Sequence, residues 1–220
     1  MKLSRDLLAV FKNFSTINPN LTIKPGNKIT TISAGKNIIA EATVDASFPE
    51  EFGIYDLNEF LGVVSLFESP DLSFTSKDVT IREGGKSVRY FASSPSVLTS
   101  VPSVKQFPMP DVEFELSGAM IGQIQRVASI LKAGDFSFVG DGQTVVVTVG
   151  DKSNPTANTF RADIGTTDKT FKINFKVENL KLMTADYAVA IGAKKIGRFQ
   201  CTTQPLMYYI AVEMDSEFDF

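Results

Sequence analysis

The residues best suited to chemistry in this chain are three carboxylates at alternate positions, Asp111, Glu113 and Glu115. Residues at every second position of a strand share a face, and three carboxylates on one face can hold a magnesium ion. The residues between them are apolar, however, which is the pattern of an antiparallel strand with one face in the core and one in water. We therefore interpret the carboxylates as a solvated strand face and not as a metal site.

Other catalytic arrangements find little support. The chain has no histidine, which excludes schemes with imidazole as base, proton shuttle or metal ligand. Cys201 is the single cysteine, so it cannot close an intrachain disulfide, and its place on an alternating strand with no basic residue nearby predicts a buried, inert side chain. Asp56 and Glu59 have the spacing of a helix-capping box, while Gly84-Gly85 indicates a hairpin turn and lacks the spacing of a phosphate-binding loop. We predict a protein that is not an enzyme and has no cofactor or metal.

The first half of the chain predicts a helix, strands, a second helix and further strands. Residues 2–14 carry apolar side chains on one face of a helix and Lys2, Arg5 and Lys12 on the opposite face, with Leu8 as the one apolar residue off the stripe. A second helix begins at Asp56 and runs to about residue 67. Strands are expected at residues 21–24, 28–33, 37–43, 72–75, 79–83 and 87–92.

The second half repeats this order of elements. We expect a strand at 111–116, a helix at 117–133, strands at 135–139, 143–149, 159–164 and 170–176, a short helix at 178–183, and strands at 187–193, 197–202 and 206–214. Residues 94–110 contain four prolines, which predicts an extended connector. The sequence thus predicts an α+β protein of two like domains, residues 1–94 and 111–220, with helices packed on antiparallel sheets and a connector at 95–110. A single irregular α+β domain is the alternative.

The charges are segregated along the chain. The net charge is −3 and the pI about 5.1, and residues 37–76 hold eight acids and no lysine or arginine. Cations gather instead on helical segments, with Arg126 and Lys132 opposite the apolar face of the third predicted helix. The alternative is a mixed-sign surface that only keeps the protein soluble. The first residues lack the unbroken apolar run of a signal peptide or membrane span, so we expect a cytoplasmic protein without a membrane partner.

Several short segments resemble the DNA polymerase sliding clamps of T-even-type bacteriophages. They are Met1-Lys2-Leu3-Ser4, Lys12-Asn13-Phe14 with Thr16-Ile17-Asn18, Ile54-Tyr55-Asp56-Leu57-Asn58 with Phe60-Leu61-Gly62, Arg126-Val127, and Ala211-Val212-Glu213 with Asp215-Ser216 and Asp219-Phe220. The similarity covers both halves and thins between residues 37–48 and 135–185.

The resemblance implies a DNA clamp fold, in which two clamp-like domains per subunit form a homotrimeric ring with helices around a central hole. It implies a processivity factor that encircles double-stranded DNA, is placed there by an ATP-driven clamp loader, and tethers the replicative DNA polymerase. It further implies a mobile activator of phage late transcription, in the cytoplasm of the infected bacterial host. A non-enzymatic phage structural or assembly protein is the alternative function, and a hydrolase that works through carboxylates is a second one.

The candidate site residues follow from these two arguments together. For sequence-independent DNA contacts we expect Lys2, Arg5, Lys12, Arg126, Lys132, Lys176 and Lys181. For partner proteins we expect apolar anchors on extended segments, namely Val104, Phe107, Pro108, Met109, Phe218 and Phe220. The alternative for the connector residues is that they pack down between the domains.

Overall fold

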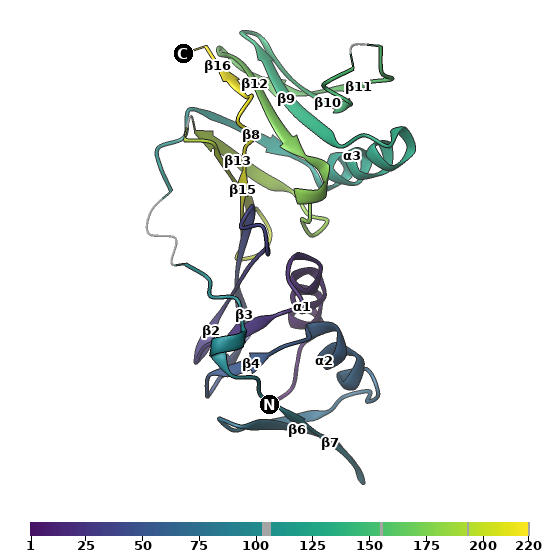
Figure 1. Ribbon diagram of the computed structural model, residues 1–220, viewed down its shortest axis with the longest axis vertical. Helices are drawn as coiled ribbons and strands as arrows, with labels where there is room; N and C mark the ends of the chain where they lie inside the picture. The colour runs from purple at the N-terminus through teal and green to yellow at the C-terminus, as the bar shows by residue number, and fades with distance from the viewer. Residues whose placement is uncertain (103–106, 155, 193, 220) are drawn as a thin grey trace. The chain divides into compact units, whose positions relative to one another are not determined.

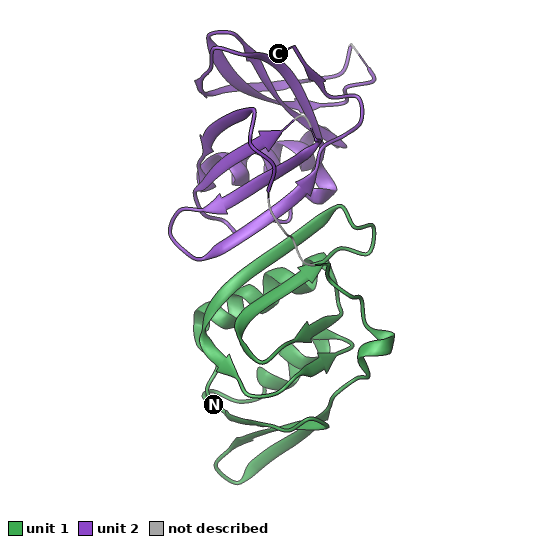
Figure 2. Ribbon diagram, turned by 90° about the vertical axis from the view of Figure 1, so that its left-hand side faces the viewer, with its two compact units in different colours: residues 1–103 green, residues 104–220 purple. Residues whose placement is uncertain are grey.

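The computed structural model describes residues 1–102, 107–154, 156–192 and 194–219. The chain divides into two compact units, residues 1–103 and 104–220 (Figure 2), and the division falls within the segment expected to be the connector. Among the described residues, no helix has both the length and the apolar character needed to cross a bilayer.

Two helices of unit 1 pack side by side (Figure 1). Helix α1 spans Arg5–Ile17, three residues later than predicted, because Ser4 forms its N-cap and accepts a hydrogen bond from the Leu7 amide at 3.1 Å. Helix α2 spans Leu57–Val64, and its predicted cap is confirmed: an Asp56 carboxylate oxygen accepts from the Asn58 and Glu59 amides at 2.9 and 3.2 Å. The predicted apolar stripe of α1 is buried.

The strands of unit 1 are all antiparallel. They are β1 (Leu21–Ile23), β2 (Gly26–Ile32), β3 (Ile38–Phe48), β4 (Phe52–Ile54), β5 (Asp71–Phe74), β6 (Asp78–Glu83) and β7 (Lys86–Phe91). β2 pairs with β3, β1 pairs with β4, and β5-β6-β7 form a three-stranded sheet. The sequence missed β4, because its three residues are all buried and show no alternation.

Aromatic rings join the elements of unit 1. The buried Phe11 ring of α1 lies 6.3 Å from Phe60 of α2 and 6.4 Å from Phe48 of β3. Phe60 also meets Tyr90 of β7 edge-on at 5.3 Å. Burial, reinforced by the nearby Glu59 carboxylate, raises the pKa of Tyr90 to about 12. These contacts fix both helices on the strands, so the opposite helix faces are left toward solvent.

Unit 2 contains one α-helix and nine strands among its described residues. They are β8 (Val112–Leu116), α3 (Gly118–Leu131), β9 (Asp135–Asp141), β10 (Thr144–Gly150), β11 (Phe160–Thr166), β12 (Thr170–Lys176), β13 (Tyr187–Gly192), β14 (Ile196–Cys201), β15 (Leu206–Ala211) and β16 (Glu217–Phe218). Antiparallel pairing links β8-β13-β14-β15 and, in a five-stranded sheet, β11-β10-β9-β12-β16. α3 lies against β9 and β10.

The prediction of a short helix at residues 178–183 is wrong. Only a single 3-10 turn forms, at Val177–Asn179, and the following Leu180 and Leu182 are both buried with Lys181 half-buried between them. Burial of every second residue is the period of extended backbone, so burying both leucines competes with helix formation.

Phenylalanine rings also form the core of unit 2. Phe136 of β9 stacks on Phe175 of β12 at 5.3 Å, and Phe175 meets Phe199 of β14 edge-on at 5.9 Å. This contact joins the five-stranded sheet to the four strands that contain β14. Cys201 is buried, as predicted, and its sulfur lies 3.5 Å from the Thr203 hydroxyl.

Candidate functional site

Two of the three cations in and just before α1 are free, and the third is hydrogen-bonded. Lys2 precedes the helix, and its ammonium donates to the Ser69 hydroxyl at 3.1 Å. Arg5 and Lys12 are exposed, and within the described part of the chain no hydrogen bond or ion pair involves their charged groups. At 100° per residue they lie within about 20° of each other around the helix and roughly 10 Å apart along it. One face of α1 therefore presents two positive charges to an external anion.

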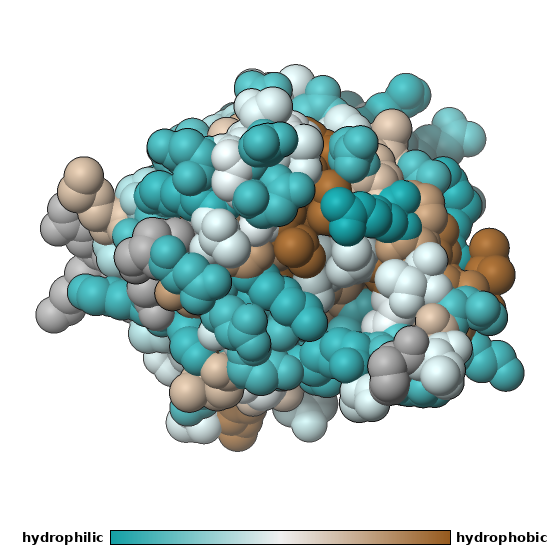
Figure 3. Space-filling view, turned by 90° about the horizontal axis from the view of Figure 1, so that it is seen from above, coloured by the Kyte–Doolittle hydropathy of each residue, from teal (hydrophilic) through white to brown (hydrophobic). Residues whose placement is uncertain are grey.

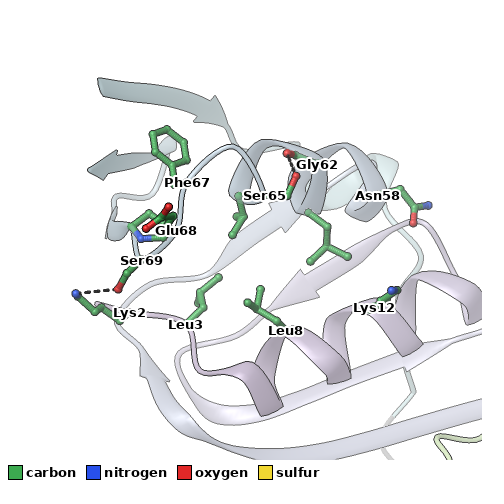
Figure 4. A pocket seen from close by; sticks show the side chains of 13 residues that line it. Lys2, Leu3, Leu8, Lys12, Asn58, Gly62, Ser65, Phe67, Glu68 and Ser69 are labelled. Carbon is green, nitrogen blue, oxygen red and sulfur yellow. Dashed lines mark hydrogen bonds between the residues drawn. The ribbon is translucent and has the colours of Figure 1, made fainter. Parts of the chain in front are cut away.

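A groove of about 490 Å³ lies between α1 and α2 (Figure 4). Leu3 and Leu8 point into it from the α1 side, and Lys2 and Lys12 lie at its two ends. Leu8, the residue off the predicted stripe, is half-buried there. The position of Leu8 is thus explained by the neighbouring helix, which the periodicity of α1 alone does not show.

The cations of α3 do not form one row. Arg126 is exposed on the helix, whereas Lys132 forms the C-cap in the left-handed conformation, with φ 52° and ψ 37°. Six residues at 100° each separate the two by roughly 120° around the helix axis. Each is exposed, and the structure leaves them as two separate positive charges.

The remaining two basic residues lie in a different setting from the one expected. Lys176 ends strand β12, and its ammonium forms an ion pair with an Asp135 carboxylate oxygen at 2.8 Å. This hydrogen bond is the main reason that the pKa of Lys176 is raised. Lys181 follows the 3-10 turn and is half-buried. Since Asp135 offsets the Lys176 charge, this residue offers less attraction to phosphate than Arg5 or Lys12.

The connector residues of unit 2 pack on strands β14 and β15. The Phe107 ring lies 6.0 Å from the Tyr209 ring, and the Arg198 guanidinium carbon lies 4.9 Å from the centre of the Phe107 ring. Phe107 and Pro108 are half-buried, while Met109 is 91% exposed. Val104 lies outside the described residues.

The tail follows a different course from the connector. Phe218 belongs to β16, which pairs with β12 and places Phe218 opposite Phe171. The segment before it is held by polar contacts: Lys152 pairs with Asp215 at 2.8 Å, and the Asn174 amide donates to the Ser216 hydroxyl at 2.9 Å. The structure therefore puts Phe218 and Phe107 on different sheets. Phe220 lies outside the described residues.

The surface seen from above unit 2 is mostly hydrophilic, with hydrophobic residues in small separate spots (Figure 3). Exposed apolar residues of unit 2 near the β13–β14 turn are Met109, Ile196 and Met214, of which Met214 is 80% exposed. The backbone carbonyl of Met214 accepts a hydrogen bond from the Lys195 ammonium.

Sequence reasoning missed Arg198 and Tyr209, which lie against Phe107, and Ile196, which shares a face of β14 with Arg198. The available signal was the alternation along β14 and β15, which turns Ile196 and Arg198 to the face opposite the buried Phe199. The alternation does not show, however, that residues about 90 positions earlier lie on that face.

The carboxylate triplet behaves as a strand face. Glu113 and Glu115 are exposed on β8 while Val112 and Leu116 are buried, as predicted. Among the residues that the structure describes, no three Cys, Asp or Glu side chains are grouped so as to hold a metal ion.

Comparison with known proteins gives consistent results at the levels of family, sequence and fold. Residues 4–98 match the family described as DNA polymerase processivity factor. Over 221 residues the chain is 31% identical to the sliding clamp of Vibrio phage KVP40, covering 97% of this chain and 99% of that protein. It is 28% identical over 228 residues to the sliding clamp of Enterobacteria phage T4, with both chains covered completely.

Solved structures support the fold. A PCNA structure from A. fulgidus, with the C-terminal region of FEN-1 bound, has a TM-score of 0.70 at 13% identity and 96% coverage of each chain. The DNA polymerase III subunit beta DnaN sliding clamp from Bartonella birtlesii has a TM-score of 0.72 at 10% identity, covering 97% of this chain and 64% of that one. These likenesses confirm the expected α+β clamp fold.

Proposed function

The chain belongs to the sliding clamps of T4-like phages, the DNA polymerase processivity factors, and from this premise we propose that three copies close into a ring around double-stranded DNA. The ring holds the replicative polymerase on its template by being threaded, without catalysing a reaction. Residues 1–94 and 111–220 act as two like clamp domains joined by the connector at 95–110.

The observation that carries the ring proposal is a sheet edge in each unit along which no described strand pairs. β7 is one of the two edge strands of the three-stranded sheet of unit 1, the other being β5, and β11 is one of the two edge strands of the five-stranded sheet of unit 2, the other being β16, as far as the described residues show. An unpaired edge strand of six or seven residues is a template for pairing with another chain. Pairing of β7 of one subunit with β11 of the next is a head-to-tail contact, which closes a ring if the rotation is right.

The DNA contacts are proposed for the free cations of the helices. Arg5, Lys12, Arg126 and Lys132 are exposed, and their charges are not paired with any other residue in the described ranges. Such contacts attract phosphates without reading the sequence, and a small number of them permits sliding because each is weak in salt. Lys2 and Lys181 are weaker candidates, and Lys176 is the weakest because of its ion pair with Asp135.

Partner proteins are proposed to bind the connector surface, which we define as Phe107, Pro108, Met109, Ile196, Arg198, Tyr209 and Met214. Its exposed Met109 and Met214 supply adaptable apolar contacts next to a cation. The partners are the polymerase, an ATP-driven clamp loader and late-transcription factors, in the cytoplasm of the infected bacterial host. Val104 and Phe220 remain proposed contacts by sequence alone, and Phe218 a separate one on β16.

Loader-dependent DNA synthesis on circular and linear templates tests this function. We expect the protein to stimulate its polymerase strongly on a closed circle and to be lost by run-off from a linear template with open ends. Sedimentation should give a discrete trimer that does not grow with concentration. Filaments or sheets would instead favour a phage assembly protein, and a monomer at high concentration would contradict the ring.

A further inference from the structure

The five-stranded sheet of unit 2 treats its two outer long strands differently. β11 and β12 each have seven residues, and among the described residues no strand pairs with the outer side of β11. The outer side of β12 is occupied by residues 213–219, which we call the edge guard and which include the two-residue strand β16. Without the guard, β12 would be a second template for pairing with another chain.

The edge guard pairs with the backbone at the start of β12. The Asp219 amide donates a hydrogen bond to the Thr170 carbonyl at 3.2 Å, and Glu217 lies opposite Lys172. Hydrogen-bonded and non-bonded residue pairs alternate along an antiparallel ladder. Since Glu217 and Lys172 lie two positions from the bond between Asp219 and Thr170, they form a hydrogen-bonded pair. The outward backbone groups of β12 are therefore already used by the guard at these positions.

Asn174 anchors the edge guard farther along β12. Its backbone carbonyl accepts from the Glu213 amide at 2.9 Å, and its backbone amide donates to the Ser216 hydroxyl at 2.9 Å. Its side-chain amide donates to a carboxylate oxygen and to the backbone carbonyl of Asp215, at 3.2 and 3.3 Å. Its side-chain carbonyl accepts from the Ser137 hydroxyl at 2.6 Å. Asn174 is only 2% exposed, so these bonds fix the guard on the strand in a place shielded from water.

The edge guard is acidic along its whole length. It contains no lysine or arginine, and its carboxylates stand at every second position, namely Glu213, Asp215, Glu217 and Asp219. Lys152 pairs with Asp215 at 2.8 Å, while the side chains of Glu217 and Asp219 are exposed. A very short edge strand that carries exposed charges discourages pairing with another chain, and two guards that approach each other repel.

The proposed ring requires the two sides of this sheet to differ. β11 and β12 have the same length, and each is antiparallel to its inner neighbour. An incoming β7 of another copy could therefore pair with either one. Pairing with β11 alone gives each copy one neighbour on each side, which permits a closed ring. Pairing with β12 as well would give a third contact per copy and open-ended, branched growth.

We propose that the edge guard closes β12 against a second copy of this chain and thereby restricts subunit pairing to β11. This inference rests on the proposed ring and adds how β7 selects one of two similar strands. Hydrogen bonds and one ion pair hold most of the guard in place. Its release exposes the polar Ser137 and Asn174, to which water can form hydrogen bonds, so the guard can leave β12 while the sheet below stays folded.

Two matched double variants of the full-length protein test the proposal. Glu217→Pro with Asp219→Pro removes the amide donors that pair with β12, whereas Glu217→Ala with Asp219→Ala removes the same carboxylates and keeps the donors. Faster hydrogen exchange of the Asn174 amide reports release of the guard. In sedimentation, we expect the alanine variant to remain a trimer. The proline variant should form larger species, with a weight-average mass that rises with concentration to about twice that of the trimer or more.

Cysteine crosslinking identifies the strand that a neighbouring copy uses. Copies with Ser87→Cys on β7 are mixed with copies that carry Asp163→Cys on β11 or Lys172→Cys on β12, and a short bismaleimide is added. The native Cys201 is buried and shielded from the reagent. We expect the β7–β11 crosslink with every form of the guard, and the β7–β12 crosslink only in the proline variant.

A proline variant that releases the guard and stays a discrete trimer overturns the proposal. Growth beyond the trimer without the β7–β12 crosslink also contradicts it, as does an equal yield of that crosslink with the guard intact. Growth of the alanine variant would show that charge alone closes the edge, and would refute the role of backbone pairing.

A second variant covers a proline variant that keeps its guard or fails to fold. Asn174→Asp sets a carboxylate against that of Asp215, so charge repulsion should release the guard and give the same larger species; a released guard with a discrete trimer again refutes the proposal. The unmodified protein keeps the two ideas apart. If it gives neither a trimer nor the β7–β11 crosslink, the proposed ring is wrong, whereas an intact ring with unchanged variants refutes this inference alone.

Discussion

Phe91 at the free edge of β7 offers a quantitative test of ring closure. The residue is 63% exposed, and a fully exposed phenylalanine presents about 200 Å² of burial on contact. An adjoining strand covers a side chain from one side, so we take half of the exposed part, about 60 Å². At about 25 cal/mol per Å² this corresponds to about 1.5 kcal/mol per interface. Phe91→Ala should therefore weaken subunit association about tenfold.

Sedimentation equilibrium over a range of protein concentrations measures this effect. Leu66→Ala is the control, because Leu66 is 68% exposed but follows α2 and belongs to no strand. The Arg89 guanidinium also lies 4.9 Å from the Phe91 ring, so thermal unfolding should be recorded to separate loss of this contact from loss of association. Unchanged association of Phe91→Ala, or equal weakening by Leu66→Ala, would refute the assignment of β7 to the interface.

Three further predictions concern DNA, backbone packing and pH. The double variant Arg5→Gln, Lys12→Gln should lower processivity and leave the trimer intact. It should also make clamp–DNA binding less dependent on salt, because each lost phosphate contact reduces the slope of log K against log salt by about 0.9. An unchanged slope would count against this face of α1 as a DNA contact. Gly53→Ala should destabilise the protein by about 2 kcal/mol or more, because its new Cβ would lie 2.3 Å from the Ser93 carbonyl oxygen. The control Gly62→Ala meets nothing within 4 Å and should stabilise the protein by about 1 kcal/mol; urea unfolding measures both changes. The hydrogen bond from Lys152 is the main reason that the pKa of Asp215 lies below its ordinary value. The ion pair therefore stabilises the fold fully above about pH 4, and this stabilisation disappears as the pH falls. Asp215→Asn should flatten the acid limb of the stability curve, and an unaltered limb would show that the ion pair is unimportant.

Much of the secondary structure could be predicted because its signals are local. The buried stripe of α1, the Asp56 cap and the Gly84 turn, with its positive φ of 57°, all depend on residues within one or two turns of chain. The sequence predictions failed for strands whose formation depends on residues far away in the chain. β4 forms because β1 offers its backbone, and β16 forms because β12 does.

The candidate site shows the same division. The sequence locates Arg5 and Lys12 on one helix face, since 3.6 residues per turn is a local property. It does not locate the Lys176 ion pair, whose partner Asp135 is 41 residues earlier, nor the contact of Phe107 with Arg198. These depend on strand pairing.

By itself, the sequence determined the order of elements, the absence of imidazole chemistry, the segregation of charge and, through its resemblance, the clamp family. Only the tertiary structure decided which cations stay free, which sheet edges stay unpaired, and that Arg198 lies beneath a connector phenylalanine. The physical reason is that helix periodicity and capping act between neighbours in the chain, whereas ion pairs, sheet edges and ring contacts arise between strands brought together by burial of the core.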